Sequence, residues 1–244
     1  FWCGIVLGCD INNLEKGMII LTGASGGVGY AILSSLSKLD SVIAVSHSTN
    51  INIDDLSGVD LHSVDLTSEN EVNEFVSTVK EKLSNVVLIH AAAISLDNIA
   101  VKFDTKDWHR SMSLNLDSNF FLTRALLTTM IQDGWGRIIH VSSIAGIKGA
   151  PGTIAYSTAK TGLMGMSKVL ANEYARFGVT SNVLVLGYLN TGLIDTLNED
   201  TRKKIIEEIP SKKLGDPSNI VNAIDFLIKS EYVNGSKIHI DGGI

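Results

Sequence analysis

The chain has 244 residues, of which 45% are hydrophobic and 19% are charged, and its formal net charge is −6. This composition suits one compact domain and excludes an intrinsically disordered protein, because enough apolar sequence is present to build a core. The acidic balance argues against a nucleic-acid surface, which needs clustered Lys and Arg, and no apolar run approaches the roughly 18 residues that could span a bilayer.

The first 17 residues differ from the rest of the chain. They contain both of its cysteines, Cys3 and Cys9, which are too few for a disulfide framework or a four-ligand zinc site. This cysteine usage favours a reducing, cytoplasmic setting. We predict an N-terminal extension of unknown role at residues 1–17 and a single folded domain at residues 18–244.

Short apolar runs rich in Val and Ile alternate with longer amphipathic stretches from residue 18 onward. The short runs predict strands at residues 18–21, 42–45, 86–89, 137–141, 182–186 and 237–240. The amphipathic stretches predict helices at residues 27–39, 69–83, 105–131, 155–177 and 217–229. Because the strands are almost continuously apolar, we expect an α/β fold with a Rossmann-type, doubly wound parallel sheet. The least regular stretch, residues 188–210, is expected to be a mobile segment near a site.

The first predicted strand runs directly into a glycine-rich turn, residues 22–29 (TGASGGVG), which a helix follows. Glycines let the backbone approach a pyrophosphate closely, and the N-terminus of the helix offers free N–H groups and a partial positive charge. The alternative is an ordinary strand-to-helix turn, which the combination of strand, turn and helix disfavours. We therefore expect a nucleotide at this turn.

The spacing T-G-x-x-x-G-x-G in this turn resembles that of the short-chain dehydrogenase/reductase family, and the resemblance extends nearly to the end of the chain. It implies an oxidoreductase with a nicotinamide cofactor, bound by a Rossmann-fold catalytic domain at residues 18–244. The cofactor-binding residues that it implies in the turn are Gly23, Ser25, Gly26, Gly27, Val28 and Gly29.

The end of the second predicted strand bears on the choice of cofactor. Rossmann-type sites that bind NAD carry a carboxylate there, which bonds the ribose hydroxyls and repels a 2′-phosphate. Ser46 and His47 stand at that place instead, so NADP(H) is favoured over NAD(H), although no Arg or Lys is present in the loop. Asp65 and Leu66 match the positions that contact the adenine in the family. The alternative for Asp65 is a helix-capping residue.

Two loops depart from the family pattern. The family has N-N-A-G where this chain has residues 90–93 (HAAA), and it has P-G where this chain has Leu186 and Gly187. The resemblance still implies cofactor contacts at Ala92, Ala93, Gly187, Leu189 and Thr191. His90 is interpreted as a core histidine, with a partner on the following helix as the alternative.

Tyr156 and Lys160 lie four residues apart at the start of a predicted helix, so the phenol and the ammonium share one face. A nearby cation favours the phenolate and lowers the pKa of a tyrosine, which is near 10 in water. The pair is therefore expected to exchange protons with a substrate, and the resemblance also implies that both residues contact the cofactor.

Two further catalytic residues are implied by the resemblance. Ser143 has the family's spacing to Tyr156 and would orient the substrate oxygen, whereas its neighbour Ser142 is interpreted as a turn residue. Asn115 matches a residue that disrupts a helix locally in the family and holds a water between the lysine and solvent. Without the resemblance, Asn115 is a polar surface residue.

The implied reaction is hydride transfer between nicotinamide and a ketone or secondary alcohol. Residues 96–98 and 191–215 are similar to those of 3-oxoacyl-[acyl-carrier-protein] reductases. The resemblance implies a small or thioester-linked ketone as the substrate, with acyl carrier protein as the leading carrier and coenzyme A as the alternative. The alternatives are a sugar or another small ketone, and a catalytically inert regulator that binds a dinucleotide. The arginines with which those reductases hold a carrier protein are replaced by Gly134 and Phe177.

Apolar residues occur on more than one face of the predicted helices at 105–131 and 155–177, which indicates a homodimer or homotetramer. The six histidines show no paired ligand spacing, so no metal site is expected. Neither a membrane nor a nucleic acid is an expected partner.

Overall fold

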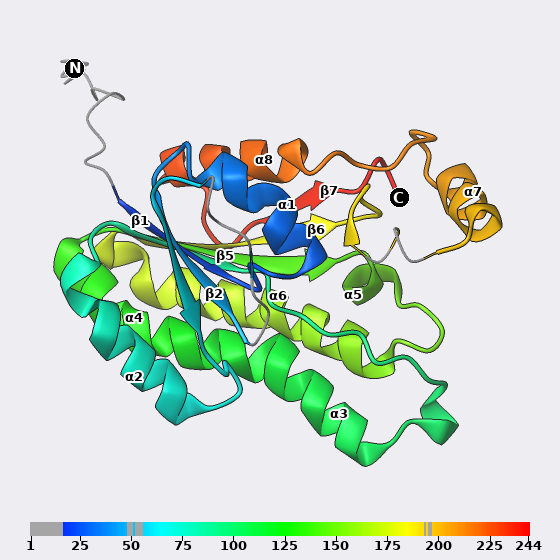
Figure 1. Cartoon of the computed structure of the whole chain (residues 1–244), viewed down its shortest axis with the longest axis horizontal. Helices are drawn as coiled ribbons and strands as arrows, with labels where there is room; N and C mark the ends of the chain where they lie inside the picture. Colours follow the sequence, from blue (N-terminus) through cyan, green and yellow to red (C-terminus); the bar gives the residue numbers. More distant parts are fainter. Residues whose placement is uncertain (1–16, 48–50, 52–55, 193, 195–196) are drawn as a thin grey trace, which may run out of the picture.

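The computed structural model describes residues 17–47, 51, 56–192, 194 and 197–244. Within them, seven strands form one sheet in the order β3-β2-β1-β4-β5-β6-β7, with every neighbouring pair parallel (Figure 1). The strands are β1 (Met18–Thr22), β2 (Ser41–Ser46), β3 (Val59–Ser63), β4 (Val86–His90), β5 (Gly136–Ser143), β6 (Val179–Leu186) and β7 (Lys237–Ile240). The predicted Rossmann-type α/β fold is confirmed. Most of the predicted N-terminal extension, residues 1–16, lies outside the described residues.

Helices cover both faces of the sheet. One face packs against α1 (Gly27–Leu36) and α8 (Ser218–Lys229), and the other against α2 (Glu69–Val79), α4 (Ser118–Asp133) and α6 (Ile154–Tyr174). The remaining helices are α3 (Thr105–Met112), α5 (Ala145–Lys148) and α7 (Glu199–Glu208), together with short turns at Lys80–Lys82, Ala100–Lys102 and Ala175–Phe177. Two apolar cores result, one on each face, as the continuously apolar strands require.

The strand order places a switch point between β1 and β4. From β1 the chain continues to β2 and β3 on one side of the sheet, whereas β4 lies on the other side of β1. In open parallel sheets, the helices on either side of such a point diverge and leave a crevice at the carboxyl ends of the strands. The glycine turn and the segment after β4 both lie there.

The structure differs from the sequence prediction in three places. Strand β3 was not predicted, because it is short and lies at the sheet edge, although Val59 and Leu61 alternate with polar residues. The segment expected to be irregular contains α7, whose first turn is capped by the Asn198 side chain accepting from Thr201 N. The long helix predicted at 105–131 is α3, a π-helical turn (Ser113–Asp117) and α4.

Candidate active site

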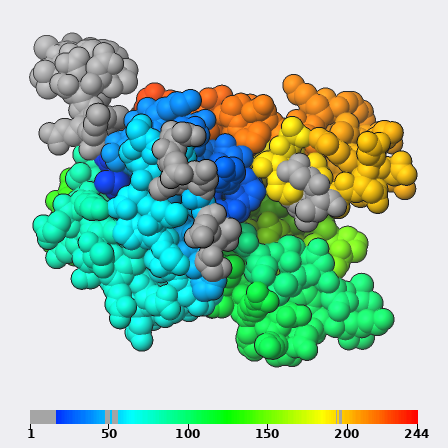
Figure 2. All heavy atoms as spheres, viewed as in Figure 1, coloured from blue at the N-terminus to red at the C-terminus, as the bar shows by residue number. Residues whose placement is uncertain are grey.

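A cavity of about 1550 Å³ opens at the carboxyl ends of the strands. Residues of α3 and α7 contribute to its wall, and in Figure 2 the green α3 segment and the gold α7 segment lie on either side of a hollow. This volume exceeds the 300 to 1,000 Å³ that is usual for a single small ligand, so it has room for a dinucleotide and a second substrate. Every site residue expected from the sequence lines the cavity, except Gly29 and Asn115.

The glycine turn fits the pyrophosphate of a dinucleotide. Helix α1 begins after Gly26, which is extended and offers no side-chain cap, and the first turn carries no acidic residue. The free N–H groups and the helix dipole are therefore available to an anion. Gly29 serves the turn instead of the cavity, because a Cβ at Gly29 would lie 2.1 Å from the carbonyl oxygen of Gly23.

The alanines after β4 pack directly against the glycine turn. The Thr22 hydroxyl accepts hydrogen bonds from the N–H groups of Ala91 and Ala92 at 3.1 and 3.2 Å, and a Cβ at Gly23 would lie 2.6 Å from the Ala92 Cα. Ala93 adopts a negative φ, since the positive-φ non-glycine residues of the described chain are Asn85 and Lys212. The departure from N-N-A-G therefore introduces no backbone strain at Ala93.

The loop after β6 also closes on the glycine turn. The Thr191 hydroxyl donates to the Gly27 carbonyl at 3.0 Å, and a Cβ at Gly27 would lie 2.3 Å from the Gly192 Cα. Gly187 follows directly after β6, and its N–H donates to the Ile240 carbonyl at 2.9 Å. The contacts expected at Gly187, Leu189 and Thr191 thus lie in a segment that is held against the turn, despite the absent proline.

Ser46, His47, Asp65 and Leu66, where the adenosine is expected, all line the cavity. The Asp65 carboxylate accepts from the N–H and the hydroxyl of Thr67 at 2.9 and 2.7 Å, and these bonds lower its pKa. The N-cap of α2 is Ser68, which accepts from Glu71 N. Asp65 is therefore not the helix cap that the sequence left as an alternative; it fixes the preceding turn and still faces the cavity.

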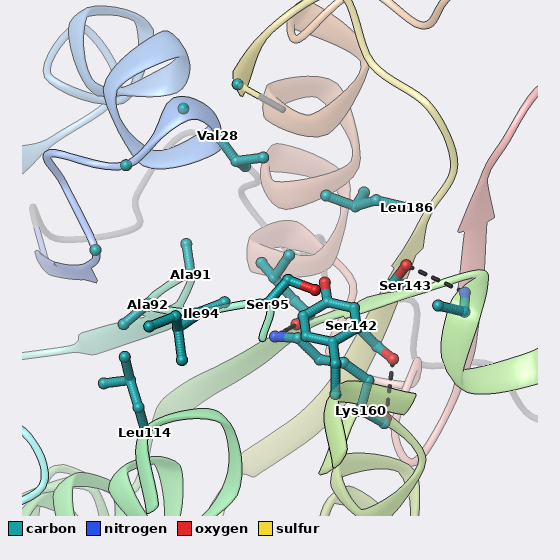
Figure 3. A pocket seen from close by; sticks show the side chains of 18 of the residues that line it. Val28, Ala91, Ala92, Ile94, Ser95, Leu114, Ser142, Ser143, Lys160 and Leu186 are labelled. Atoms are coloured by element: carbon teal, nitrogen blue, oxygen red, sulfur yellow. Dashed lines mark hydrogen bonds between the residues drawn. The ribbon is translucent and has the colours of Figure 1, made fainter. Parts of the chain in front are cut away.

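Strand β5 holds Lys160 at two atoms. The ammonium donates to the Val141 carbonyl at 2.8 Å, and the Ser142 hydroxyl donates to the main-chain carbonyl of Lys160 at 2.9 Å. Figure 3 shows Ser142 and Ser143 beside Lys160, with Ile94 and Leu114 across the cavity. Ser142 is a buried residue of β5, so its interpretation as a turn residue was wrong. Sequence reasoning missed its contact with the lysine.

Burial shifts the pKa values of both members of the Tyr156 and Lys160 pair. It lowers the pKa of Lys160 from 10.5 to about 8. It also raises the pKa of Tyr156, and the charge of Asp97 acts in the same direction, whereas a hydrogen bond with Ser143 lowers it. From the sequence we expected a lowered pKa for Tyr156, but in the free protein desolvation by burial is the largest cause and raises it. The Lys160 Nζ lies 5.6 Å from the Tyr156 ring centroid.

Asn115 lies in the π-helical turn, fully buried behind the cavity wall. Its side chain accepts from the N–H of Ile94 at 3.0 Å and donates to the Ile94 carbonyl at 2.8 Å and to the Ser111 hydroxyl at 3.0 Å. The interpretation of Asn115 as a polar surface residue, made without the resemblance, was wrong. The helix is disrupted around Asn115, as the resemblance implies. The side chain ties the π-helical turn to the segment that follows β4.

His90 is both of the things that the sequence left open. It is buried in the core, and its Nε2 lies 2.9 Å from the Thr123 hydroxyl on α4, the helix after Asn115. Its ring stacks on that of His140, with centroids 5.1 Å apart. Within the described part of the chain, no group of three or more His, Cys, Asp or Glu residues could hold a metal ion, and no helix is long and apolar enough to cross a bilayer.

Comparisons with known proteins agree with this geometry. A family model described as enoyl-(acyl carrier protein) reductase matches residues 23–244. The chain is 36% identical to the 3-oxoacyl-[acyl-carrier-protein] reductase FabG of Rickettsia bellii, over 95% of this chain and 98% of that protein. It is 33% identical to nodulation protein G of Azospirillum brasilense, over 95% and 99% of the two chains. A crystal structure of a candidate gluconate dehydrogenase from Agrobacterium tumefaciens superposes with a TM-score of 0.87 at 26% identity, over 94% of this chain and 96% of that one.

Proposed function

The chain belongs to the short-chain dehydrogenase/reductase family, and on that premise we propose that it reduces the keto group of a 3-oxoacyl thioester with NADPH. Family membership makes it an oxidoreductase that uses a nicotinamide cofactor. The substrate, the choice between NADPH and NADH and the role of each residue are the parts that we propose.

The proposed roles are those that the family resemblance implies, and we propose them for the side chains as the structure places them. The bound cofactor supplies the hydride. Ser143, whose hydroxyl accepts from Ala145 N at 3.1 Å, orients the substrate oxygen and stabilises the charge that develops there. Tyr156 donates its proton to that oxygen, and its raised pKa keeps the phenol protonated before the reaction. Lys160 stabilises the phenolate that remains and contacts the nicotinamide ribose, and Asn115 supports proton resupply.

The apolar wall of the cavity is the observation that carries the choice of substrate. Six aliphatic side chains from four separate segments line the same cavity as Ser143 and Tyr156: Ile94, Ile144, Leu189, Ile194, Leu197 and Ile205. Such a wall suits an acyl chain, because the hydroxyls of a sugar would lose their hydration there without gaining partners. The apolar wall favours a fatty acyl thioester over a gluconate-like substrate, although the structural neighbour is described as a gluconate dehydrogenase.

The end of β2 supports NADPH over NADH. Ser46 and His47 line the cavity there, and neither carries a charge that would repel a 2′-phosphate. The Ser46→Asp variant introduces the carboxylate that ribose-binding sites use. It is expected to lower the ratio of NADPH to NADH turnover by at least about tenfold, the rate equivalent of one charge-assisted hydrogen bond. An unchanged ratio would place the 2′-phosphate elsewhere.

The acyl thioester is proposed to reach the site attached to a carrier protein. Arg137 is buried and donates to the carbonyls of Ile228, Gly136 and Gly178, so it is not available to an acidic partner. Arg176 stacks on Phe177, with its guanidinium carbon 4.6 Å from the ring centroid. We therefore expect carrier-linked and coenzyme-linked thioesters to be turned over with similar efficiency.

Self-association is the remaining part of the proposal. Phe120 on α4 and Val169 on α6 are 45% and 54% exposed, which leaves apolar surface on the helices expected at an interface. A homodimer or homotetramer would cover it. Size-exclusion chromatography that places the purified protein at the mass of one chain would contradict this part alone.

A substrate panel tests the proposed activity. Purified protein is supplied with NADPH or NADH and with 3-oxoacyl thioesters of increasing chain length, simple ketones and keto-sugars, and cofactor oxidation is followed by absorbance. We expect the longer thioesters with NADPH to give the highest kcat/KM. Preference for a keto-sugar would favour a sugar dehydrogenase, and tight cofactor binding without any turnover would favour the inert regulator.

One pair of variants tests whether the apolar wall holds the acyl chain. Ile205 lines the cavity, whereas its neighbour Ile206 on α7 does not. Ile205→Ser is expected to raise KM for long thioesters more than for short ones, and Ile206→Ser is expected to leave the chain-length preference unchanged. Equal effects of the two substitutions would show that α7 does not contact the acyl chain.

A further inference from the structure

The buried histidine pair is a feature that the proposed mechanism does not use. His90 and His140 are direct partners in the register of β4 and β5, both are almost fully buried, and their rings are stacked with an interplanar angle of 7°. Burial lowers the pKa of both imidazoles, that of His140 to about 3, and the nearby charge of Lys160 lowers them further. Both rings are therefore neutral at neutral pH, and Lys160 is the cation of this buried layer.

Both histidines bond to α4, but through different residues. His90 Nε2 lies 2.9 Å from the Thr123 hydroxyl, and His140 Nδ1 lies 3.2 Å from the Asn119 side-chain oxygen. Asn119 and Thr123 are four residues apart, so they lie on one face of α4. The two contacts are thus alike in burial, in strand position and in the helix that they reach.

Only the His140 contact continues to the π-helical turn. The Asn119 amide nitrogen donates to the main-chain carbonyl of Asn115 at 3.5 Å, and it also faces the Ser118 hydroxyl. Its side-chain oxygen is consequently the atom that accepts from His140. A π-helical turn interrupts the regular helical ladder, so the Asn115 carbonyl can bond to groups outside it.

This chain of contacts fixes the tautomer of His140. Because the Asn119 oxygen can only accept, the proton of the neutral ring resides on Nδ1. The Nε2 atom is then a bare lone pair, and among the described residues it has no hydrogen-bond partner. A buried lone pair favours a neighbouring cation such as the Lys160 ammonium, whereas a second N–H in that place would oppose it.

In the proposed mechanism, Lys160 and Asn115 both support the proton transfer from Tyr156, and the same strand segment is linked to both residues. Val141 and Ser142 hold Lys160, and the preceding residue, His140, reaches the Asn115 carbonyl through Asn119. We propose that His140 is a positioning residue, which holds the Asn115 carbonyl in register with Lys160 through Asn119. This inference rests on the proposed function for its kinetic consequence, but the tautomer and the coupling of the residues do not depend on it.

Matched substitutions on the two strands separate this role from a structural one. His140→Phe and His90→Phe each remove one imidazole of the stack and one contact to α4. We expect His140→Phe to lower kcat by about fivefold, the rate equivalent of one hydrogen bond, and to raise the solvent isotope effect on kcat. His90→Phe is expected to leave kcat and the solvent isotope effect within twofold of the wild type. Its melting temperature is expected to fall by about as much as that of His140→Phe. Equal kinetic effects of the two variants would overturn the proposal.

A second pair of variants acts from α4 and covers the case in which a phenylalanine does not fold. Asn119→Leu breaks the chain at its middle, and Thr123→Val removes the partner of His90. The first is expected to reproduce the kinetic signature of His140→Phe, and the second is not. Adding His140→Phe to Asn119→Leu is expected to cost no further activity, because both changes break the same chain. A double variant whose loss of kcat is the product of the two single losses would contradict the proposal.

The ring nitrogens give a readout that needs no turnover. Nitrogen NMR of the purified protein is expected to show His140 neutral at pH 7, with its proton on Nδ1, and to show this preference lost in Asn119→Leu but kept in Thr123→Val. A proton on Nε2, or an imidazolium, would overturn the proposal even in an active enzyme. If this pattern is found and the wild type reduces no carbonyl compound, the proposed function fails and the positioning chain stands.

Discussion

The Lys160 ammonium donates a hydrogen bond to the main-chain carbonyl of Val141 at 2.8 Å, inside a fully buried environment. A main-chain carbonyl carries only a partial charge, so it compensates little of the hydration that the ammonium has lost. The pKa of Lys160 accordingly falls to about 8. The cation that the reaction uses is thus held in place at a cost to the stability of the fold.

Removing that cation is expected to stabilise the protein. Because the pKa of Lys160 falls from 10.5 to about 8 on folding, the unfolded chain binds the proton more tightly between these values, and stability rises with pH there. The penalty at pH 7 corresponds to roughly 3 kcal/mol. Lys160→Met is therefore expected to have a higher free energy of unfolding than the wild type at pH 7, reduced by the contribution of the lost bond to Val141. Above pH 10.5 the two proteins are expected to differ little in stability. Urea unfolding at both pH values measures this; a variant that is less stable at pH 7 would contradict it.

The rate of reduction is expected to fall as the pH rises through about 8. Tyr156 stays protonated in this range because its pKa is raised, so the loss of the Lys160 charge is the event that limits the reaction. Steady-state kcat/KM for NADPH, which reports the ionisable groups of the free enzyme, checks the prediction when it is measured on both sides of pH 8. A rate that is constant or rises beyond that pH would mean that the lysine charge is not required.

The close approach of the glycine turn to the loop after β6 gives a prediction about packing. A Cβ at Gly27 would lie 2.3 Å from the Gly192 Cα, so Gly27→Ala must displace the loop that carries Thr191. We expect it to destabilise the protein by about 1 to 3 kcal/mol and to weaken cofactor binding.

Gly165→Ala is the matched control on α6, where a Cβ meets no atom within 4 Å. Replacing a glycine within a helix is expected to stabilise the protein by about 0.5 to 1 kcal/mol without changing the cofactor Kd. Thermal unfolding and cofactor titration separate the two variants, and equal effects would show that the contact at Gly192 has no consequence.

Local patterns in the sequence, namely apolar strand runs, glycine spacing and helical periodicity, predicted the sheet, the glycine turn and the pairing of Tyr156 with Lys160. Ser143 was assigned from the family resemblance, and all three side chains line one cavity. The sequence did not predict which residues hold Lys160. Ser142 and His140 are buried polar residues two apart in β5, hence on one face. That signal could have marked a buried polar layer, but its partners on α4 and α6 are distant in sequence and are brought near only by packing.

The raised pKa of Tyr156 could not have been predicted for a related reason. A spacing of four residues places a cation near the phenol, but the burial of the phenol depends on the loops around it, including the one that carries Asp97. Desolvation and a nearby cation act in opposite directions on the pKa of a tyrosine, and their balance is a property of the folded chain.

Comparison of the wild type with Tyr156→Phe tests the central claim most directly. Both proteins are supplied with NADPH and a 3-oxoacyl thioester, cofactor oxidation is followed by absorbance, and the cofactor Kd is measured on the same samples. Because phenylalanine fills the site but has no proton to donate, the variant is expected to bind NADPH as the wild type does and to lose at least about a hundredfold in kcat, the lower range for general acid catalysis. A variant that binds the cofactor and still reduces the thioester at the wild-type rate would contradict the claim that Tyr156 is the proton donor of this reductase.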